Sequence, residues 1–259
     1  MTDKQSVLME KDNGIGTITL NRPEQKNTFT LGFATLLNHH LKALDEDDEV
    51  RVVVIKATGK HFSTGIDLAE FKDKSPGELR AMIGKMDQHN HTIAQMKKPV
   101  IASVRGYAIA NGAGLVFASD LAVVSENARF GTTAINVGLI CLGPAVPLSR
   151  LVSRKKLLEM VLGGDILQAE EAEGLGLVNK VVPDEELESA TMALAEKLSQ
   201  KSPLAVECGK KGIYGMSDLP YHQSLDYMGE MFTQLCTTND AQEGLAAFQE
   251  QRKPNWTRT

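Results

Sequence analysis

Short apolar runs alternate with longer segments of helical length through the first half of this chain, and that alternation most limits its fold. Few polar residues interrupt the apolar runs, which is typical of strands buried on both faces, as in parallel sheets. The segments between them are long enough for helices that cross from one parallel strand to the next. The order β-α-β-α-β predicts an α/β fold with right-handed crossovers. The predicted strands are 14–20, 52–57, 100–104 and 121–124, and the predicted helices are 31–44 and 75–96.

The second half of the chain is predominantly helical in pattern, because its apolar residues recur at helical spacing. Glycine and proline residues divide it into separate helices. We therefore expect a core domain over residues 1–195 and a C-terminal helical region over residues 196–259. Within this half, helices are predicted from 146, 169 and 185 onward, with a short strand over 177–182 and breaks near Pro203, Gly215 and Pro220.

The composition is that of a globular protein with an acidic surface. At 259 residues, a single domain buries about three quarters of its unfolded surface and needs no disulfide or metal. The 28 Lys and Arg residues against 33 Asp and Glu residues give a net charge of −5. That balance argues against a nucleic-acid-binding protein. No apolar run reaches the ~18 residues that a membrane span needs, so we expect neither a nucleic acid nor a membrane as partner.

The cysteines and the first residues bear on the compartment. Cys141, Cys208 and Cys236 are odd in number and far apart, which is typical of reduced thiols. No Cys/His spacing predicts a metal site. Residues 1–5 lack the basic and apolar regions of a secretion signal. We therefore expect a cytoplasmic protein without a metal.

Two glycine-bearing turns follow predicted strands, and ligands gather at the carboxyl ends of the strands in parallel α/β sheets. The first turn covers residues 60–68, and the second covers residues 105–114. Small residues in the second turn come directly before a helical stretch, which leaves backbone N–H groups at a helix start free to face an anionic oxygen. A small-residue turn of this kind also serves simple close packing. The pattern alone leaves both interpretations open.

Together these segments resemble the crotonase (enoyl-CoA hydratase/isomerase) superfamily in the same order along nearly the whole chain. The resemblance implies a crotonase-like spiral of ββα units, a C-terminal helical region that completes a homotrimer or a dimer of trimers, and an acyl-CoA thioester as substrate. It implies a lyase or isomerase of fatty acid metabolism, with coenzyme A as part of the substrate and no separate cofactor. The matching segments are 21–27, 61–68, 98–102, 106–114, 128–131 and 248–252.

By the same resemblance, two backbone N–H groups form an oxyanion hole for a thioester enolate. The donors are the N–H of Ile66, just after Gly65, and the N–H of Asn111. Such a donor stabilises the developing charge by about 3–4 kcal/mol. The family usually has glycine where this chain has Asn111, which keeps the N–H and adds a side chain.

The acid/base positions of the family carry no titratable side chain here. Hydratases of the family place one glutamate shortly after the second glycine turn and another after the Phe-Gly motif, and these positions are Gly114 and Ala134. A mechanism that activates water with one carboxylate and delivers the proton with the other needs both groups. The sequence therefore predicts an oxyanion hole without the usual pair of glutamates.

One cysteine and several loop residues are the other candidates. Cys141 lies in a turn that the resemblance places beside the acyl group, where a thiol of lowered pKa acts as nucleophile or proton donor. A small buried hydrophobic residue is the alternative for Cys141. For binding of the coenzyme A moiety, the resemblance offers Lys26, Ser63, Gly65, Ile66, Asp67, Leu68, Gly112, Phe248 and Lys253.

Three functions remain open on the sequence. The first is an acyl-CoA enzyme that stabilises an enolate. The second is a non-catalytic acyl-CoA-binding protein that has kept the fold without the acid and base. The third is a thioester-cleaving enzyme that uses Cys141.

Overall fold

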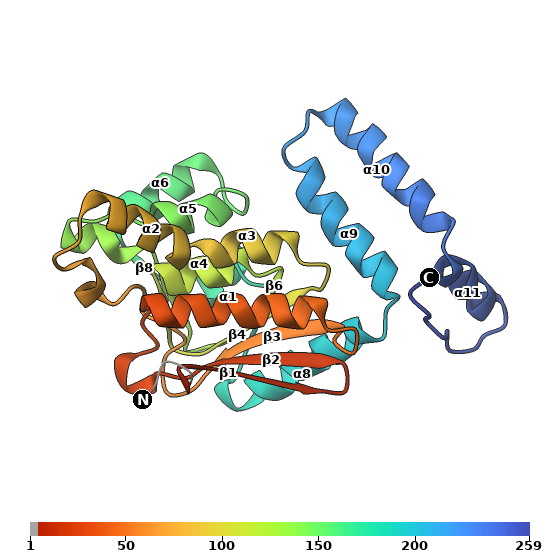
Figure 1. Cartoon of the computed structure of the whole chain (residues 1–259), viewed down its shortest axis with the longest axis horizontal. Helices are drawn as coiled ribbons and strands as arrows, with labels where there is room; N and C mark the ends of the chain where they lie inside the picture. The colour runs from red at the N-terminus through yellow and green to blue at the C-terminus, as the bar shows by residue number, and fades with distance from the viewer. Residues whose placement is uncertain (1–4) are drawn as a thin grey trace.

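The computed structural model describes residues 5–259 as a core of two sheets with surrounding helices, from which a helical arm extends (Figure 1). The main sheet has six strands in the order β1-β2-β3-β4-β6-β9. Only the pair β1 and β2 is antiparallel, and the other neighbours are parallel. The strands are β1 (Val7–Asp12), β2 (Ile15–Leu20), β3 (Val52–Ala57), β4 (Val100–Val104), β6 (Leu121–Ser125) and β9 (Lys180–Val182).

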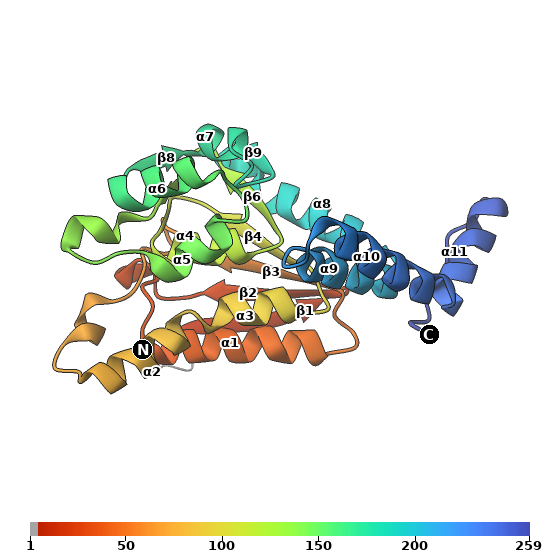
Figure 2. The same ribbon diagram turned by 90° about the horizontal axis from the view of Figure 1, so that it is seen from above.

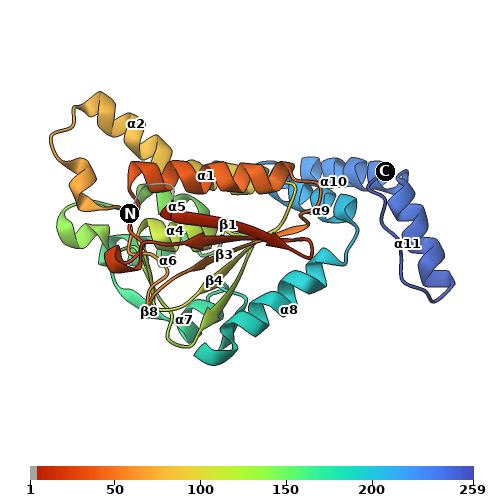
Figure 3. The same cartoon turned by 60° about the horizontal axis from the view of Figure 1, so that its bottom comes forward.

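Helices cover both faces of the main sheet. Helix α1 (Leu31–Glu46) lies on one face and α8 (Leu187–Ser199) on the other (Figure 3). Side chains of β3 alternate between these two layers: Val53 and Ile55 pack in the cluster with α1, while Val52 and Val54 pack in the cluster with α8. Because successive side chains of a strand point to opposite faces, burial of both faces accounts for the uninterrupted apolar run.

A second sheet of three short strands lies next to the main one. Strand β5 pairs with β7 in parallel, and β7 pairs with β8 antiparallel. Because β5 follows β4 and leads directly into a helix, these elements form one strand-strand-helix unit of the expected spiral. The expected α/β fold is thus confirmed. Its elements are β5 (Tyr107–Ile109), α4 (Asn111–Ala118), β7 (Arg129–Gly131) and β8 (Ile166–Gln168).

The helix predicted over residues 75–96 is two helices. They are α2 (Pro76–Met86) and α3 (Gln88–Gln95), and the chain breaks between them at Asp87. The helical pattern of the second half is confirmed. Its helices are α5 (Leu142–Leu148), α6 (Arg154–Gly163) and α7 (Ala169–Gly174), followed by α8 and three helices of the arm.

The arm consists of α9 (Pro203–Met216), α10 (Tyr221–Cys236) and α11 (Asn239–Gln249), which extend away from the sheets (Figures 1 and 2). The expected boundary at residue 195 falls inside α8. Ala195 and Leu198 of α8 pack in the cluster under the sheet, so that helix belongs to the core and the arm begins with α9. In the range 5–259, no helix combines the length and the apolar character needed to cross a bilayer.

A buried ion pair ties the arm to the core. Asp120 accepts a hydrogen bond from the N–H of Val100 (2.7 Å), and Lys210 of α9 donates to the same carboxylate (2.6 Å). Tyr214, one turn further along α9, donates to its other oxygen (3.0 Å). Burial raises the pKa of Asp120 and lowers the pKa of Lys210, and each charge opposes the shift of its partner. The Asp120 carboxylate therefore joins β4, the start of β6 and α9.

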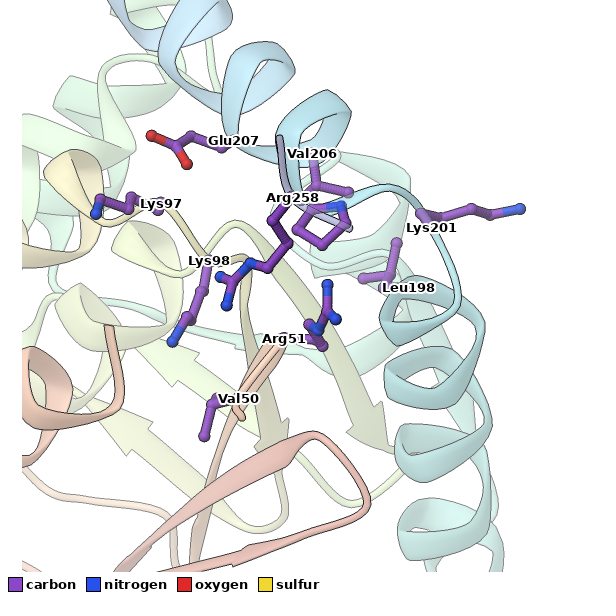
Figure 4. A pocket seen from close by; sticks show the side chains of 10 residues that line it. Val50, Arg51, Lys97, Lys98, Leu198, Lys201, Val206, Glu207 and Arg258 are labelled. Carbon is purple, nitrogen blue, oxygen red and sulfur yellow. The ribbon is translucent and has the colours of Figure 1, made fainter. Parts of the chain in front are cut away.

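The C-terminal tail returns to the core through a cluster of cations at the amino ends of the strands. The guanidinium of Arg258 lies between Lys98 and Arg51 (Figure 4) and donates to the Asp48 carbonyl (2.7 Å). Lys98 donates to backbone carbonyls near the end of α1, and burial lowers its pKa to about 8. Buried Asp240 accepts hydrogen bonds from the backbone N–H of Arg258 (3.0 Å) and that of Thr257 (2.8 Å). The hydrogen bonds to Asp48 and Asp240 therefore fasten the tail, against the repulsion of Arg258 by Arg51 and Lys98.

We predict that Asp120→Ala lowers the free energy of unfolding by about 3–5 kcal/mol, because Lys210 then remains buried without its counter-charge. Urea unfolding measures the effect. The double variant Asp120→Ala/Lys210→Met recovers most of the loss, since it removes both charges together. A single variant as stable as the wild type contradicts the assignment of Asp120 as the anchor.

Candidate functional site

The two glycine-bearing turns run side by side because Ser63 and Ala108 form a parallel bridge. The N–H of Ser63 donates to the Tyr107 carbonyl (3.0 Å), and the N–H of Ile109 donates to the Ser63 carbonyl (2.9 Å). The buried hydroxyl of Ser63 donates to the Asn27 carbonyl (2.7 Å). The backbone of Ser63 thus fixes one turn against the other, while its side chain, which was predicted to contact coenzyme A, ties the first turn to the loop at Asn27.

Three small residues allow the turns to approach closely. Gly65 has φ +93°, and a Cβ there would lie 2.8 Å from the Cβ of Ala110 and 3.7 Å from the Asn111 nitrogen. A Cβ on Gly112 would lie only 2.3 Å from the Ser63 carbonyl oxygen. Ala110 itself has φ +50°, a conformation that costs a residue with a Cβ and is common next to functional sites. This packing brings the start of α4 next to Gly65.

Within residues 5–259, neither the N–H of Ile66 nor the N–H of Asn111 has a protein hydrogen-bond acceptor. Phe29 pairs with the residues on either side of Ile66: its N–H donates to the Gly65 carbonyl, and its carbonyl accepts from Asp67. Asn111 is the first residue of α4, where the N–H groups have no partner inside the helix. The positive end of the helix dipole adds to their attraction for an anionic oxygen.

The position of the first family glutamate is crowded. A Cβ on Gly114 would lie 3.0 Å from the ring of Pro144, so any side chain there requires that proline to shift slightly. Ala134 lies in the short helix η4 (Thr133–Val137) and is half-buried. Neither position holds a titratable group, as the sequence indicates.

A carboxylate that the sequence interpretation missed stands beside this region. Asp87, at the break between α2 and α3, accepts a hydrogen bond from the side-chain amide of Asn111 (3.0 Å). Its other oxygen lies against Gly143, where an added Cβ would be 2.3 Å away. Burial raises the pKa of Asp87, while the Asn111 hydrogen bond and the charge of His91 oppose that shift.

Cys141 lies next to the same carboxylate. The thiol is 4% exposed, and burial together with the charge of Asp87 raises its pKa, although the Ala134 backbone opposes the shift. A raised pKa keeps the thiol protonated, which opposes its use as a nucleophile. The small buried residue that was the alternative for Cys141 agrees with this geometry.

The residues predicted to bind coenzyme A are dispersed. Lys26 is exposed. Burial lowers the pKa of His61, and the charges of Lys26 and Lys60 add to that shift, so both lysines lie near this imidazole. Asp67 caps η3 (Leu68–Phe71) through the N–H of Ala69 (3.1 Å). Leu68, the first residue of η3, is exposed.

The predicted contacts near the C-terminus lie far from this region in the same chain. Phe248 is 84% exposed on α11, at the end of the arm opposite to α2 and α5 (Figures 1 and 2). Lys253 follows α11 and is also exposed. No group of three His, Cys, Asp or Glu side chains that could hold a metal ion occurs between residues 5 and 259.

Comparison with known proteins places these features in a family. A model described as enoyl-CoA hydratase/isomerase matches residues 10–259. Enoyl-CoA hydratase domain-containing protein 3 of Xenopus laevis is 36% identical over 96% of this chain and 85% of that protein. A probable enoyl-CoA hydratase of Dictyostelium discoideum is 34% identical over 95% of this chain and 89% of that protein.

Solved structures of similar proteins have the same fold. An enoyl-CoA hydratase of Mycobacterium smegmatis superposes with a TM-score of 0.93 at 36% identity, covering 97% of this chain and 98% of that one. Human enoyl-CoA hydratase domain-containing protein 3 gives 0.93 at 33% identity, covering 97% of this chain and all of that one.

The expected cytoplasmic location is wrong on this comparison. The relatives from Xenopus laevis, Mus musculus and Dictyostelium discoideum are all named mitochondrial. The expectation depended on residues 1–5, of which 1–4 lie outside the described residues, and on reduced cysteines. Free thiols report a reducing environment and do not identify the compartment.

We predict that Gly112→Ala separates the two turns, because the new Cβ would overlap the Ser63 carbonyl oxygen. Overlap of this kind costs about 1–3 kcal/mol of folding stability, which urea unfolding measures. Gly84→Ala in α2 is the control, because nothing lies within 4 Å of its added Cβ. Equal stability of the two variants contradicts the close approach at Gly112.

Proposed function

The chain belongs to the enoyl-CoA hydratase/isomerase family, and we propose that it binds an acyl-CoA thioester and stabilises the enolate of its acyl group. The observation that carries this proposal is the pair of unpartnered N–H groups of Ile66 and Asn111, held together by the Ser63–Ala108 bridge. Both belong to backbone that the surrounding packing fixes, so they need no reorganisation when charge develops.

The chemistry follows from where the charge develops. Removal of a proton from the α-carbon of a thioester moves an electron pair onto the carbonyl oxygen, which becomes an oxyanion. Donors that bind this oxygen more strongly in the transition state than in the ground state accelerate the step. Each donor of this kind contributes about 3–4 kcal/mol. The proposed reaction class is therefore proton transfer at the α-carbon.

Addition of water is disfavoured by the same geometry. The two-carboxylate route needs titratable groups at residues 114 and 134, and Pro144 occupies the space beside Gly114. An isomerase activity moves a proton without adding water, so it needs fewer acid/base groups than a lyase activity does. We therefore propose proton transfer on an acyl-CoA thioester and not hydration as the reaction.

Lys26 and Lys60 support binding of the coenzyme A moiety. Both lysines act electrostatically on His61 at the entrance of the first turn, and coenzyme A carries several phosphate charges. We assign this pair to the phosphates. Phe248 and Lys253 reach an acyl-CoA only if they come from another copy of the chain, because α11 lies at the far end of the arm.

The arm supports assembly into a trimer or a dimer of trimers. One stripe of α10 exposes Tyr221, Leu225 and Phe232, which lie at helical spacing and leave a large apolar surface uncovered. Exposed apolar patches of this kind mark protein–protein interfaces. We propose that copies of this chain cover the stripe.

We predict that the protein catalyses exchange of the α-protons of butyryl-CoA for deuterium in D2O, and that it does not hydrate crotonyl-CoA. Mass spectrometry follows the exchange, and loss of the conjugated thioester absorbance follows hydration. Binding without exchange, measured by calorimetry, would instead identify an acyl-CoA-binding protein. Rapid loss of the crotonyl-CoA absorbance contradicts the assignment to proton transfer alone.

We also predict a mass of three or six chains by light scattering, where one chain has 28.2 kDa. Phe232→Asp places a charge on the exposed stripe of α10 and lowers the mass toward that of one chain. Lys211→Asp on α9, whose side chain is half-exposed, is the control for a new charge on the arm. A wild-type protein of one-chain mass overturns the proposed assembly.

A further inference from the structure

The carboxylate of Asp87 does not perform the usual function of an aspartate at a helix start. Asp87 is the N-cap residue of α3, yet its side chain makes no capping hydrogen bond to that helix. Aspartate at an N-cap normally accepts from the N–H groups of its own first turn. Here the carboxylate extends away from α3 to the start of α4 and to Gly143 of α5.

Two neighbours make room for this placement and hold it. The side-chain amide of Asn111 donates to one carboxylate oxygen, and Gly143 leaves the space that the other oxygen occupies. Asn111 thereby has two functions in the proposed site. Its backbone N–H is the second oxyanion donor, and its side-chain amide orients the Asp87 carboxylate. A glycine, which the family usually has at this position, could supply only the first.

We propose that Asp87 is the catalytic residue that carries the proton in the reaction of this site, a task for which the family usually uses glutamates at the positions of Gly114 and Ala134. The proposal depends on the enolate chemistry proposed above. The substrate class is an acyl-CoA thioester with an acidic α-hydrogen, including a β,γ-unsaturated one.

The proton and the electrons balance within the site. The α C–H bond breaks, its proton passes to a carboxylate oxygen of Asp87, and its electron pair moves to the thioester oxygen held by Ile66 and Asn111. The protonated Asp87 then returns the proton. Return to the α-carbon, after the carboxyl proton has exchanged with solvent, gives exchange of the α-hydrogen. Return to the γ-carbon of a dienolate moves a β,γ double bond into conjugation.

The surroundings of Asp87 suit a group that both accepts and donates a proton. Burial raises its pKa, which brings the carboxyl group closer to the neutral range where a general base is most effective. His91 on α3 lowers the pKa of Asp87 through its charge, and the Cys141 thiol at the start of α5 stays neutral because its own pKa is raised. The side-chain amide of Asn111 on α4 also contacts the Asp87 carboxylate.

The principal test compares α-deuterium exchange of butyryl-CoA by the wild type, Asp87→Asn and Asp12→Asn. Loss of a general base lowers a rate by about 10²–10⁴-fold, and we expect that loss in Asp87→Asn with little change in the dissociation constant for butyryl-CoA. Asp12→Asn makes the same chemical change on an exposed residue at the end of β1 and retains the wild-type rate.

A second variant tests the role even if Asp87→Asn fails to fold. Asn111→Gly keeps the backbone N–H of the oxyanion hole and removes the side chain that orients Asp87. Because that hydrogen bond lowers the pKa of Asp87, its loss raises the pKa. The base is active when deprotonated, so the acidic limb of the pH–rate profile moves to higher pH in Asn111→Gly.

The outcomes separate this inference from the proposed function. A wild type that exchanges no deuterium overturns the enolate chemistry itself. A wild type that exchanges, with Asp87→Asn equally fast or with an unmoved acidic limb in Asn111→Gly, overturns the role of Asp87 alone. Loss of exchange in Cys141→Ala with full activity in Asp87→Asn would assign the proton to the thiol instead.

Discussion

The short parallel bridge between Ser63 and Ala108 is the contact on which the candidate site depends. It joins the turn after β3 to the turn before α4, although the two lie more than forty residues apart in the sequence. The bridge requires glycine at residue 112, since any Cβ there would overlap the Ser63 carbonyl oxygen. Without the bridge, the turn that carries Ile66 would not be held next to the start of α4. With it, the turn of Ile66 lies beside the start of α4, since a Cβ on Gly65 would be 3.7 Å from the Asn111 nitrogen, and the two proposed oxyanion donors belong to neighbouring backbone.

The sequence predicts the core strands and most helices well because their physical signal is local. The strand predicted at 52–57 matches β3, and that predicted at 100–104 matches β4, since burial on both faces leaves a continuous apolar run. Strand β1 was missed because it is an edge strand with five of its six residues exposed. The strands of the second sheet are three residues long, too short for a periodic pattern. The predicted boundary at residue 195 lies within α8 because the periodicity of that helix does not say which layer it covers.

The candidate site was predictable only where backbone chemistry defines it. The turns that carry Ile66 and Asn111 follow predicted strands, and the resemblance to the family assigned their N–H groups to one oxyanion hole. Asp87 could not be found in this way. Its contact with Asn111 joins side chains of two helices, and its break of the helical segment 75–96 carries no glycine or proline signal.

The packing around Gly114 and Gly143 explains why a carboxylate from another wall of the site would be needed. Pro144 fills the space beside residue 114, and the absence of a Cβ at the adjacent Gly143 admits the carboxylate of Asp87. These two neighbouring residues therefore close one route for a titratable group and open another. A glutamate at residue 114 would have to move Pro144, and with it the start of α5 that accommodates Asp87. Crowding at residue 114 and space at residue 143 therefore both favour Asp87 as the proposed proton carrier.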